Sequence, residues 1–562
     1  MVEVCYRSGV HDAGPLARLR AQLAGPRGAR RVDALLSAPD PVAAVASLSV
    51  TEIYELVSEV GLDDASELVH LATPEQVRGC LDLEVWDRDH PSMELARPWL
   101  ASLVDAGFEK LGQVWGGLDP EWRALFIKQH CRRIWDLTLG EEPDDTTDLP
   151  MYFTTDRFFT LELSGDEDTV RLVRQLLDDL YRADADLARH TIMAARSESV
   201  TELEEESFRW RSGRLADLGY VDYYEALELF RPLEAEAVRA GEGTEDRLGN
   251  IVDGDVTSAN LPIAVAEHVV ARSFLARAWD RLGDDVEEIR LEGALLVVVN
   301  KLLAAARTRP GDQASLRAGA DYATATISLG LEVVSRGDID RAAETLRTVA
   351  LGRLFRAGYT VGAKLARLAH GLAPRAVTAG EPDVSVLGAL TQPRPWFARA
   401  LDEAGRPGLR PFESQSDVRK VAELLGRLTL RFAIAESLGV DLLGMRNVPE
   451  PRPELDDHAR TAIARAVGGG ELSAQALAHD EVRVAKALLE RGVFPEKVRT
   501  RAQRAILARL DDARIHAAGD QLRDLVEGWL GDVEETLSAL EATRIDARYV
   551  TGILVETGGA RA

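Results

Sequence analysis

Arginine and aromatic side chains gather between residues 207 and 230 (SFRWRSGRLADLGYVDYYEALELF), where they could bind a ligand. A guanidinium group beside a stacking ring can hold an anion or a planar molecule, through charge-assisted hydrogen bonds and cation–π attraction. The candidate ligand-binding residues are Arg209, Trp210, Arg211, Arg214, Tyr220, Tyr223 and Tyr224.

The same segment has a structural interpretation. Phe208, Arg211 and Leu215 share one helical face with Leu218, so Arg211 is expected to point inward. A buried arginine needs a carboxylate partner, and the glutamates of residues 202–206 and Asp217 are candidates. The pattern favours this second interpretation, an ion-pair network between domains.

Acidic side chains crowd residues 73–90 (TPEQVRGCLDLEVWDRDH) and raise the question of a metal site. A calcium-binding EF-hand loop needs a glutamate at position 12, and counting from Asp82 or from Asp87 provides none. We therefore expect a helical corner anchored by apolar residues, whose acids face water or cap the next helix. The acids and the histidine concerned are Asp82, Glu84, Asp87, Asp89 and His90.

Other catalytic or metal-binding patterns are weak. Glu67 and His70 form one E-x-x-H motif, whereas a di-iron bundle needs two, so a surface pair is expected. His130 and His190 lie on apolar helix faces and are expected to be core histidines. Phosphate-binding loops, dinucleotide fingerprints, nucleophile elbows and H-E-x-x-H motifs are absent from the sequence. We predict no catalytic residue, no metal and no cofactor.

The elements that position these residues are predicted to be short helices. Asp40, Thr73 and Asp119 each precede a proline and can begin a helix, and Thr73 with Gln76 fits a capping box. Apolar residues between these starts recur at three- and four-residue spacing, so each helix has one face to bury. Helices this short must stack on their neighbours, so we predict that residues 30–140 form only helices, arranged as a solenoid.

The rest of the chain is also predicted to be helical, and the fold class is all-α. Residues 157–163 (RFFTLEL) alternate like an isolated strand, and a long helix is expected over residues 168–196. The predicted division is an N-terminal extension (1–30), a helical superhelix (31–140), a helical domain that can include the lone strand (151–240), a helical domain (261–375) and a C-terminal helical domain (385–562).

Composition excludes several classes of partner. The 562-residue chain has 93 acidic and 67 basic residues, a net charge of −26 that repels phosphate backbones, so we predict no nucleic-acid binding. Three separated cysteines favour neither disulfides nor a thiolate metal site. The most apolar run, residues 293–300, is far shorter than the ~20 residues that span a bilayer. We expect no membrane insertion and a cytoplasmic location.

Two resemblances add to this interpretation. Residues 30–140, with LVSEVGLDDASELVHLATPEQVRGCLDLEVWDRD, resemble the superhelical N-terminal domain of magnesium transporters. The whole chain, with FRWRSGRLADLGYVDYYEAL and LGRLFRAGY, looks like a bacterial family of unknown function. The first resemblance implies an α-solenoid scaffold; transport is not implied, because no membrane-spanning segment or cystathionine-synthase-type sensor domain is recognised.

These observations predict a non-enzymatic helical scaffold or adaptor that binds other proteins. The alternative is an enzyme or ligand-responsive regulator that uses residues 209–224. A divalent-cation responder is a third hypothesis, which rests on the transporter resemblance and the acidic charge. The sequence does not indicate an oligomeric state.

Overall fold

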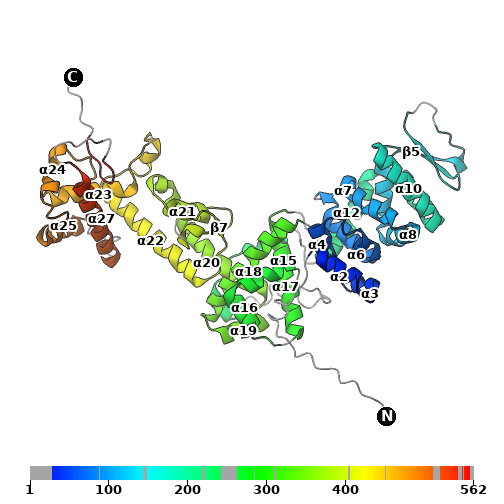
Figure 1. Cartoon of the computed structure of the whole chain (residues 1–562), viewed down its shortest axis with the longest axis horizontal. Helices are drawn as coiled ribbons and strands as arrows, with labels where there is room; N and C mark the ends of the chain where they lie inside the picture. Colours follow the sequence, from blue (N-terminus) through cyan, green and yellow to red (C-terminus); the bar gives the residue numbers. More distant parts are fainter. Residues whose placement is uncertain are drawn as a thin grey trace, which may run out of the picture. The chain divides into compact units, whose positions relative to one another are not determined.

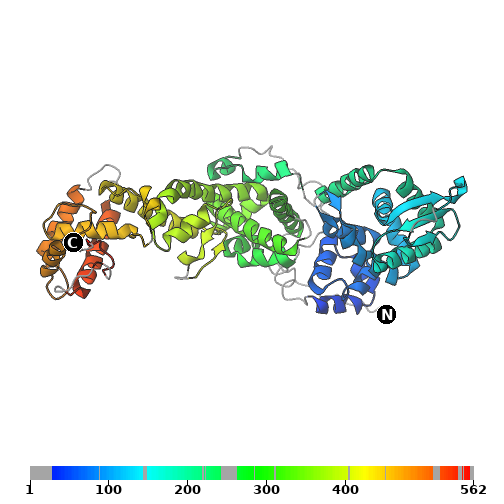
Figure 2. The same ribbon diagram turned by 90° about the horizontal axis from the view of Figure 1, so that it is seen from above.

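The computed structural model confirms the all-α fold class, with a few small strands (Figure 1 and Figure 2). It describes residues 28–87, 89–143, 148–217, 221, 223–241, 263–283, 285–308, 312–402, 406–449, 451–509, 519–541, 547 and 550–556. The chain forms two compact units, an N-terminal unit (Met1–Thr360) and a C-terminal unit (Val361–Ala562). The finer division that the sequence suggests stays a prediction.

Short helices with side-chain caps open the N-terminal unit, as predicted. Asp40 accepts a hydrogen bond from the Ala43 amide at 3.0 Å, and Thr73 and Gln76 complete a capping box. Proline follows both caps and loses no helical hydrogen bond there. The helices are α2 (Ala29–Leu36), α3 (Pro41–Ala46), α4 (Val50–Val60), α5 (Ser66–Leu71), α6 (Pro74–Glu84), α7 (Met93–Asp105), α8 (Phe108–Gly117) and α9 (Pro120–Gln129).

The prediction that residues 30–140 form only helices is wrong. A two-residue hairpin, β1 (Trp86–Asp87) with β2 (His90–Pro91), follows α6, and β3 (Cys131–Asp136) follows α9. Strand β3 forms because a distant segment completes its backbone hydrogen bonds, which no local pattern can reveal.

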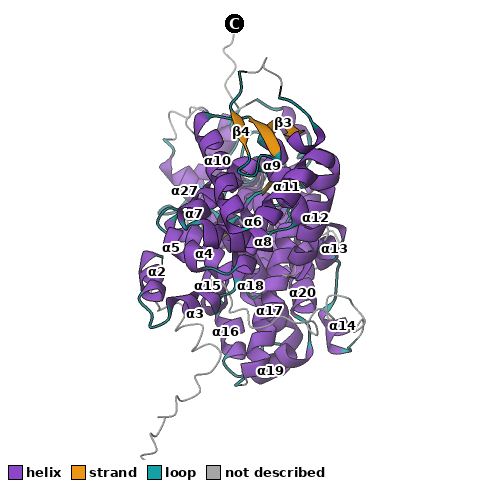
Figure 3. Ribbon diagram, turned by 90° about the vertical axis from the view of Figure 1, so that its right-hand side faces the viewer, coloured by secondary structure: helices purple, strands orange, loops and turns teal. Residues whose placement is uncertain are grey.

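The predicted lone strand is the centre of a three-stranded antiparallel sheet. The strand order is β3, β5 (Phe159–Leu163), β4 (Met151–Phe153), and this sheet lies beside α9 and α11 (Figure 3). All five residues of β5 are buried, so both faces of this central strand are covered. The strand was therefore predicted correctly, but the prediction that it stands alone is wrong.

The long helix predicted over residues 168–196 is two helices, α10 (Glu167–Ala183) and α11 (Ala185–Ser197). Asp184 leaves helical geometry between them, and its carboxylate accepts hydrogen bonds from the first-turn amides of α11. Helix α12 (Val200–Asp217) follows. A single hydrophobic cluster runs from Val32 to Leu215, so α10, α11 and α12 share one core with the first helices.

The remainder of the N-terminal unit is helical as well. Helices α18 and α20 cross where Gly330 faces Gly358, and a Cβ atom on either glycine would collide with the backbone of the other helix. Its helices are α13 (Tyr223–Leu227), α14 (Ala235–Arg239), α15 (Ile263–Ala271), α16 (Ser273–Trp279), α17 (Asp285–Ala305), α18 (Gln313–Ser335), α19 (Ile339–Thr348) and α20 (Leu351–Leu372), which extends past the unit boundary.

In the C-terminal unit, α22 to α25 and α27 pack around a hydrophobic cluster that includes Phe494 and Trp529. Its elements are α21 (Asp383–Leu390), β6 (Phe397–Ala398), β7 (Leu409–Arg410), α22 (Gln415–Ser437), α23 (Leu455–Val467), α24 (His479–Ala487), α25 (Glu496–Arg509) and α27 (Gly519–Ala539). Short 3₁₀ turns in the chain are η1 (Leu137–Leu139), η2 (Glu228–Phe230), η4 (Ala373–Thr378), η5 (Arg399–Leu401) and η6 (Gly444–Asn447). Among the described residues, no helix is both long and apolar enough to cross a membrane.

Candidate functional site

Arg214 on α12 joins two other helices through a pair of aspartates. Its Nε lies 2.6 Å from Asp82 Oδ2 and its Nη2 lies 2.9 Å from Asp82 Oδ1, in the last turn of α6. The same guanidinium donates to both oxygens of Asp119, at 3.0 and 2.7 Å. Asp119 occupies the N-cap position of α9 but makes no capping hydrogen bond, because its carboxylate faces Arg214. One side chain thus links three helices.

In this cluster, burial and hydrogen bonding shift the pKa values of the charged groups in opposite directions. Burial raises the pKa of Asp82, and the neighbouring charge of Asp119 adds to that shift, while the hydrogen bonds from Arg214 act in the opposite direction. For Arg214, burial alone would lower the pKa, but hydrogen bonds to both carboxylates raise it above its ordinary value. Arg214 therefore stays charged, and the two carboxylates share its single positive charge.

Arg211, one helical turn before Arg214, is buried as predicted, with only 5% of its surface exposed. Its Nε donates to the main-chain carbonyl oxygen of Asp82 at 2.9 Å, and its guanidinium carbon lies 4.8 Å from the centre of the Trp86 ring. The acids expected near it were those of residues 202–206 and Asp217. The hydrogen bond to Asp82 reaches 129 residues back along the chain, and no sequence signal indicates that pairing. A carboxylate partner for Arg211 stays a prediction.

The neighbouring Arg209 and Trp210 point elsewhere. Arg209 is exposed and pairs with Glu206 one turn earlier at 3.5 Å, and Trp210 is 50% exposed. The guanidinium carbon of Arg209 lies 6.0 Å from the Trp210 ring centre, at the outer limit of cation–π attraction. These two residues therefore belong to the outer surface of α12, whereas Arg211 and Arg214 belong to its inner face.

The predicted tyrosines make a separate group. Tyr223 lies under Arg307, whose guanidinium carbon is 4.2 Å from the ring centre, and it meets Tyr224 edge-on at 5.4 Å. Tyr224 is 76% exposed. Tyr220 lies outside the described residues. The structure thus divides the candidate segment into three parts: an inner brace (Arg211 and Arg214), an outer aromatic surface (Arg209 and Trp210) and a tyrosine pair (Tyr223 and Tyr224). Ligand binding by the whole set stays a prediction.

The acidic residues after Thr73 also have different partners and do not meet at one point. The expectation that these acids face water is wrong for Asp82, which is buried, because α12 packs over the end of α6 and supplies its counter-charge. Glu84 accepts a hydrogen bond from the Tyr54 hydroxyl, and His90 lies 3.5 Å from Glu204. Within the described ranges, no group of three or more histidine, cysteine, aspartate or glutamate side chains could hold a metal ion.

The histidines have different environments. His130 is a core histidine as predicted: its Nδ1 lies 2.8 Å from the Phe126 carbonyl oxygen, and burial lowers its pKa. His190 is exposed, so the core prediction is wrong there; the helix break at Asp184 changes which residues of α11 face inward. His70 contacts the Ser102 carbonyl oxygen at 2.8 Å.

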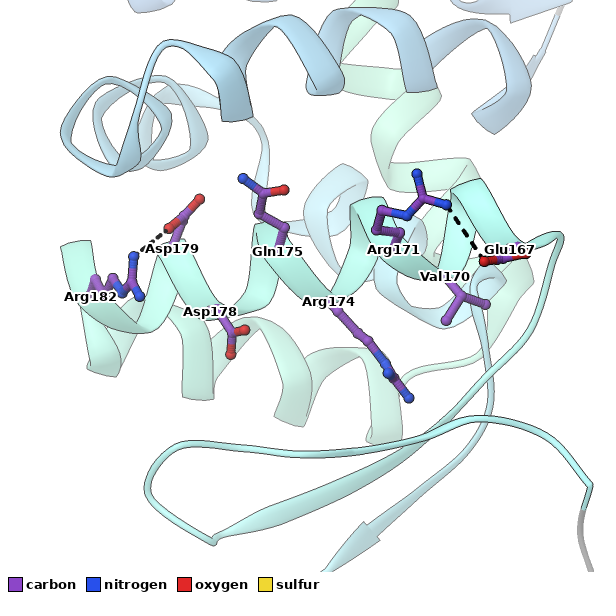
Figure 4. Close-up of a pocket in the computed structure, with 8 residues that line it drawn as sticks. All are labelled: Glu167, Val170, Arg171, Arg174, Gln175, Asp178, Asp179 and Arg182. Carbon is purple, nitrogen blue, oxygen red and sulfur yellow. Dashed lines mark hydrogen bonds and ion pairs between the residues drawn. The ribbon is translucent and has the colours of Figure 1, made fainter.

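A groove of about 490 Å³ runs along α10, and Figure 4 shows that one helix supplies all the side chains drawn in it. The charged groups in this groove have partners. Arg171 pairs with Asp168 at 3.2 Å, Arg182 pairs with Asp179 at 3.3 Å, and Arg174 donates to the Met151 carbonyl oxygen at 3.0 Å. An open groove on one helix, with its charges already paired, offers little to orient a ligand.

The fold and these contacts define an all-α protein whose N-terminal unit contains a braced helix with an exposed aromatic surface. The chain belongs to the family described as "Family of unknown function (DUF6178)", whose model matches residues 10–556. No curated protein and no solved structure matches it.

Proposed function

We propose that this protein is a non-enzymatic scaffold or adaptor that binds other proteins through the outer face of α12. The observation that supports this most directly is the half-exposed Trp210, on a helix whose inner face Arg211 and Arg214 hold in place. Tryptophan and arginine are enriched among the residues that contribute most to protein–protein binding.

The brace formed by Arg211 and Arg214 would favour the binding of a partner. A helix that is already ordered loses little conformational freedom when a partner binds, so more of the contact energy appears as affinity. Phe208 lies beside the buried Trp86, with ring centres 6.3 Å apart, and this contact further holds α12 against the end of α6.

The charge of α12 points to a kind of partner. Glu202 and Glu205, in the first half of the helix, are exposed, and the chain as a whole has a net charge of −26. We therefore propose that the partner presents an apolar surface flanked by lysine or arginine. Complementary charge of this kind speeds encounter and selects among partners.

The wider architecture is part of the same proposal. The helices α2 to α9 are proposed to form a superhelix like the N-terminal domain of magnesium transporters, which would serve as the scaffold. A cytoplasmic location is part of the same proposal.

The experiment compares the full-length protein with Trp210→Ala. A partner that is captured in stoichiometric amount and cross-links to α12 is purified, and its affinity is measured by calorimetry. We expect Trp210→Ala to weaken binding about 30-fold, the effect of losing an interface contact worth about 2 kcal/mol. Phe153→Ala is the control, because this exposed aromatic residue lies on β4. Equal affinity of wild type and Trp210→Ala would refute the proposal.

A further inference from the structure

A second, open cavity of about 590 Å³ lies within the C-terminal unit and differs from the groove on α10 because several elements line it. Its walls come from the start of α21, one face of α22, the start of α23, the 3₁₀ turn η5 and α27. The size is typical of small-molecule sites, which usually combine an apolar wall with a few polar groups that orient the ligand.

One wall of this cavity is apolar. Leucines from four different elements contribute to it, so a ligand would meet some hydrocarbon as well as charged groups. These residues are Leu401, Leu424, Leu455 and Leu525. Burying apolar ligand surface here would contribute about 25 cal/mol for each Å² removed from water.

Most of the cations around the cavity already have partners. Arg431 binds Asp456 at 2.7 Å and also binds Asp383, so its charge is satisfied from two sides. Lys420 pairs with Asp402 at 3.2 Å. Arg460 pairs with two aspartates, Asp457 at 3.1 Å and Asp532 at 2.9 Å. These ion pairs connect the elements around the cavity and leave their members less able to bind a ligand.

Two charged residues of the cavity, Glu423 and Arg427, have no such partner in the part of the chain that the structure describes. They lie four residues apart on α22 in the order that normally favours an ion pair between neighbouring helical turns. Neither side chain makes an ion pair or hydrogen bond within the part of the chain that the structure describes, and both line the cavity. An exposed anion and an exposed cation, one helical turn apart, therefore line the cavity without pairing with each other.

We propose that this cavity binds a small zwitterion with an apolar body, of which an aliphatic α-amino acid is the simplest example. Its carboxylate would bind Arg427, its ammonium group would bind Glu423, and its side chain would lie against the leucines. A simple anion fits less well, because five carboxylates and four cations line the cavity. A simple cation would leave its own charge beside Arg427.

The test is calorimetry on the full-length protein with L-leucine as the probe. We expect saturable binding that Arg427→Gln and Glu423→Gln each weaken at least tenfold. Arg419→Gln is the matched control, because Arg419 is an exposed arginine of the same helix that does not line the cavity. Circular dichroism of each variant checks that α22 remains folded.

Two analogues separate the contributions of the charges. Leucinamide lacks the carboxylate and N-acetyl-leucine lacks the ammonium group, and each should bind at least tenfold more weakly than L-leucine. The proposal is overturned if L-leucine does not bind, if either analogue binds as well, or if Arg419→Gln weakens binding as much as Arg427→Gln. Trp210→Ala should leave leucine binding unchanged, so this result is independent of the proposed adaptor function.

Discussion

Arg214 and Asp82 stand 132 residues apart in the sequence and form a two-point ion pair, with nitrogen–oxygen distances of 2.6 and 2.9 Å. This planar arrangement uses two guanidinium nitrogens on two carboxylate oxygens, which is the strongest geometry available to such a pair. Because Asp82 is buried, the pair fixes where α12 meets α6.

Replacing Asp82 by asparagine should destabilise the protein. The change leaves Arg214 with Asp119 as its remaining carboxylate partner in this cluster, and losing a hydrogen-bonded charge partner costs about 1.5–3 kcal/mol. Urea unfolding followed by circular dichroism measures the loss. Asp87→Asn is the control, because Asp87 is exposed on the hairpin and its replacement should change stability by less than about 0.5 kcal/mol. Equal stability of the two variants would show that the brace contributes nothing.

Arg211→Ala should lower stability by about 3 kcal/mol, because a buried hydrogen bond from a charged group contributes about 1.5–3 kcal/mol and the contact with an aromatic ring adds to it. The change removes the hydrogen bond to the Asp82 carbonyl oxygen and the contact with the Trp86 ring. Arg209→Ala, on the exposed face of the same helix, should change stability by less than about 0.5 kcal/mol. If both variants unfold at the same urea concentration as wild type, Arg211 is not part of the brace.

The burial of His130 predicts a pH dependence. Burial lowers its pKa in the folded state, so below the ordinary value of about 6.5 the unfolded chain binds the extra proton more readily. The contribution of His130 to stability is therefore present above that pH and is lost as the pH falls toward the folded-state pKa. We expect a smaller fall in melting temperature between pH 7 and pH 5 in His130→Gln than in wild type. His190→Gln, at an exposed position, should follow wild type; if it matches His130→Gln instead, burial is not the cause.

The crossing of α18 and α20 predicts that Gly358→Ala is destabilising. The added Cβ atom would meet the Thr326 carbonyl oxygen, and overpacking of this kind costs about 1–3 kcal/mol. Gly371→Ala on the same helix is the control, since a Cβ atom there meets nothing within 4 Å. Alanine favours helix by about 1 kcal/mol over glycine, so that variant should be slightly stabilised. Melting temperatures that shift in the same direction for both would contradict the close contact.

Local chemistry made part of the architecture predictable. The caps at Asp40 and Thr73 need only neighbouring residues, because a side-chain oxygen reaches amides two or three positions ahead. The inward direction of Arg211 followed from apolar spacing along one helix, and the all-α class followed from the same periodicity. The alternation of β5 was visible for the same reason, since each of these features repeats within a few residues.

Tertiary structure decided which distant groups meet. The sheet forms only when β3 pairs with β5. Asp119 does not make the expected capping hydrogen bond, because its carboxylate binds Arg214, 95 residues away. The exposure of His190 depends on a break at Asp184 that shifts the helical phase. A buried charge selects its partner by proximity and desolvation in the folded state, so the sequence determined which segments form helices, and packing determined which charges those helices bring together.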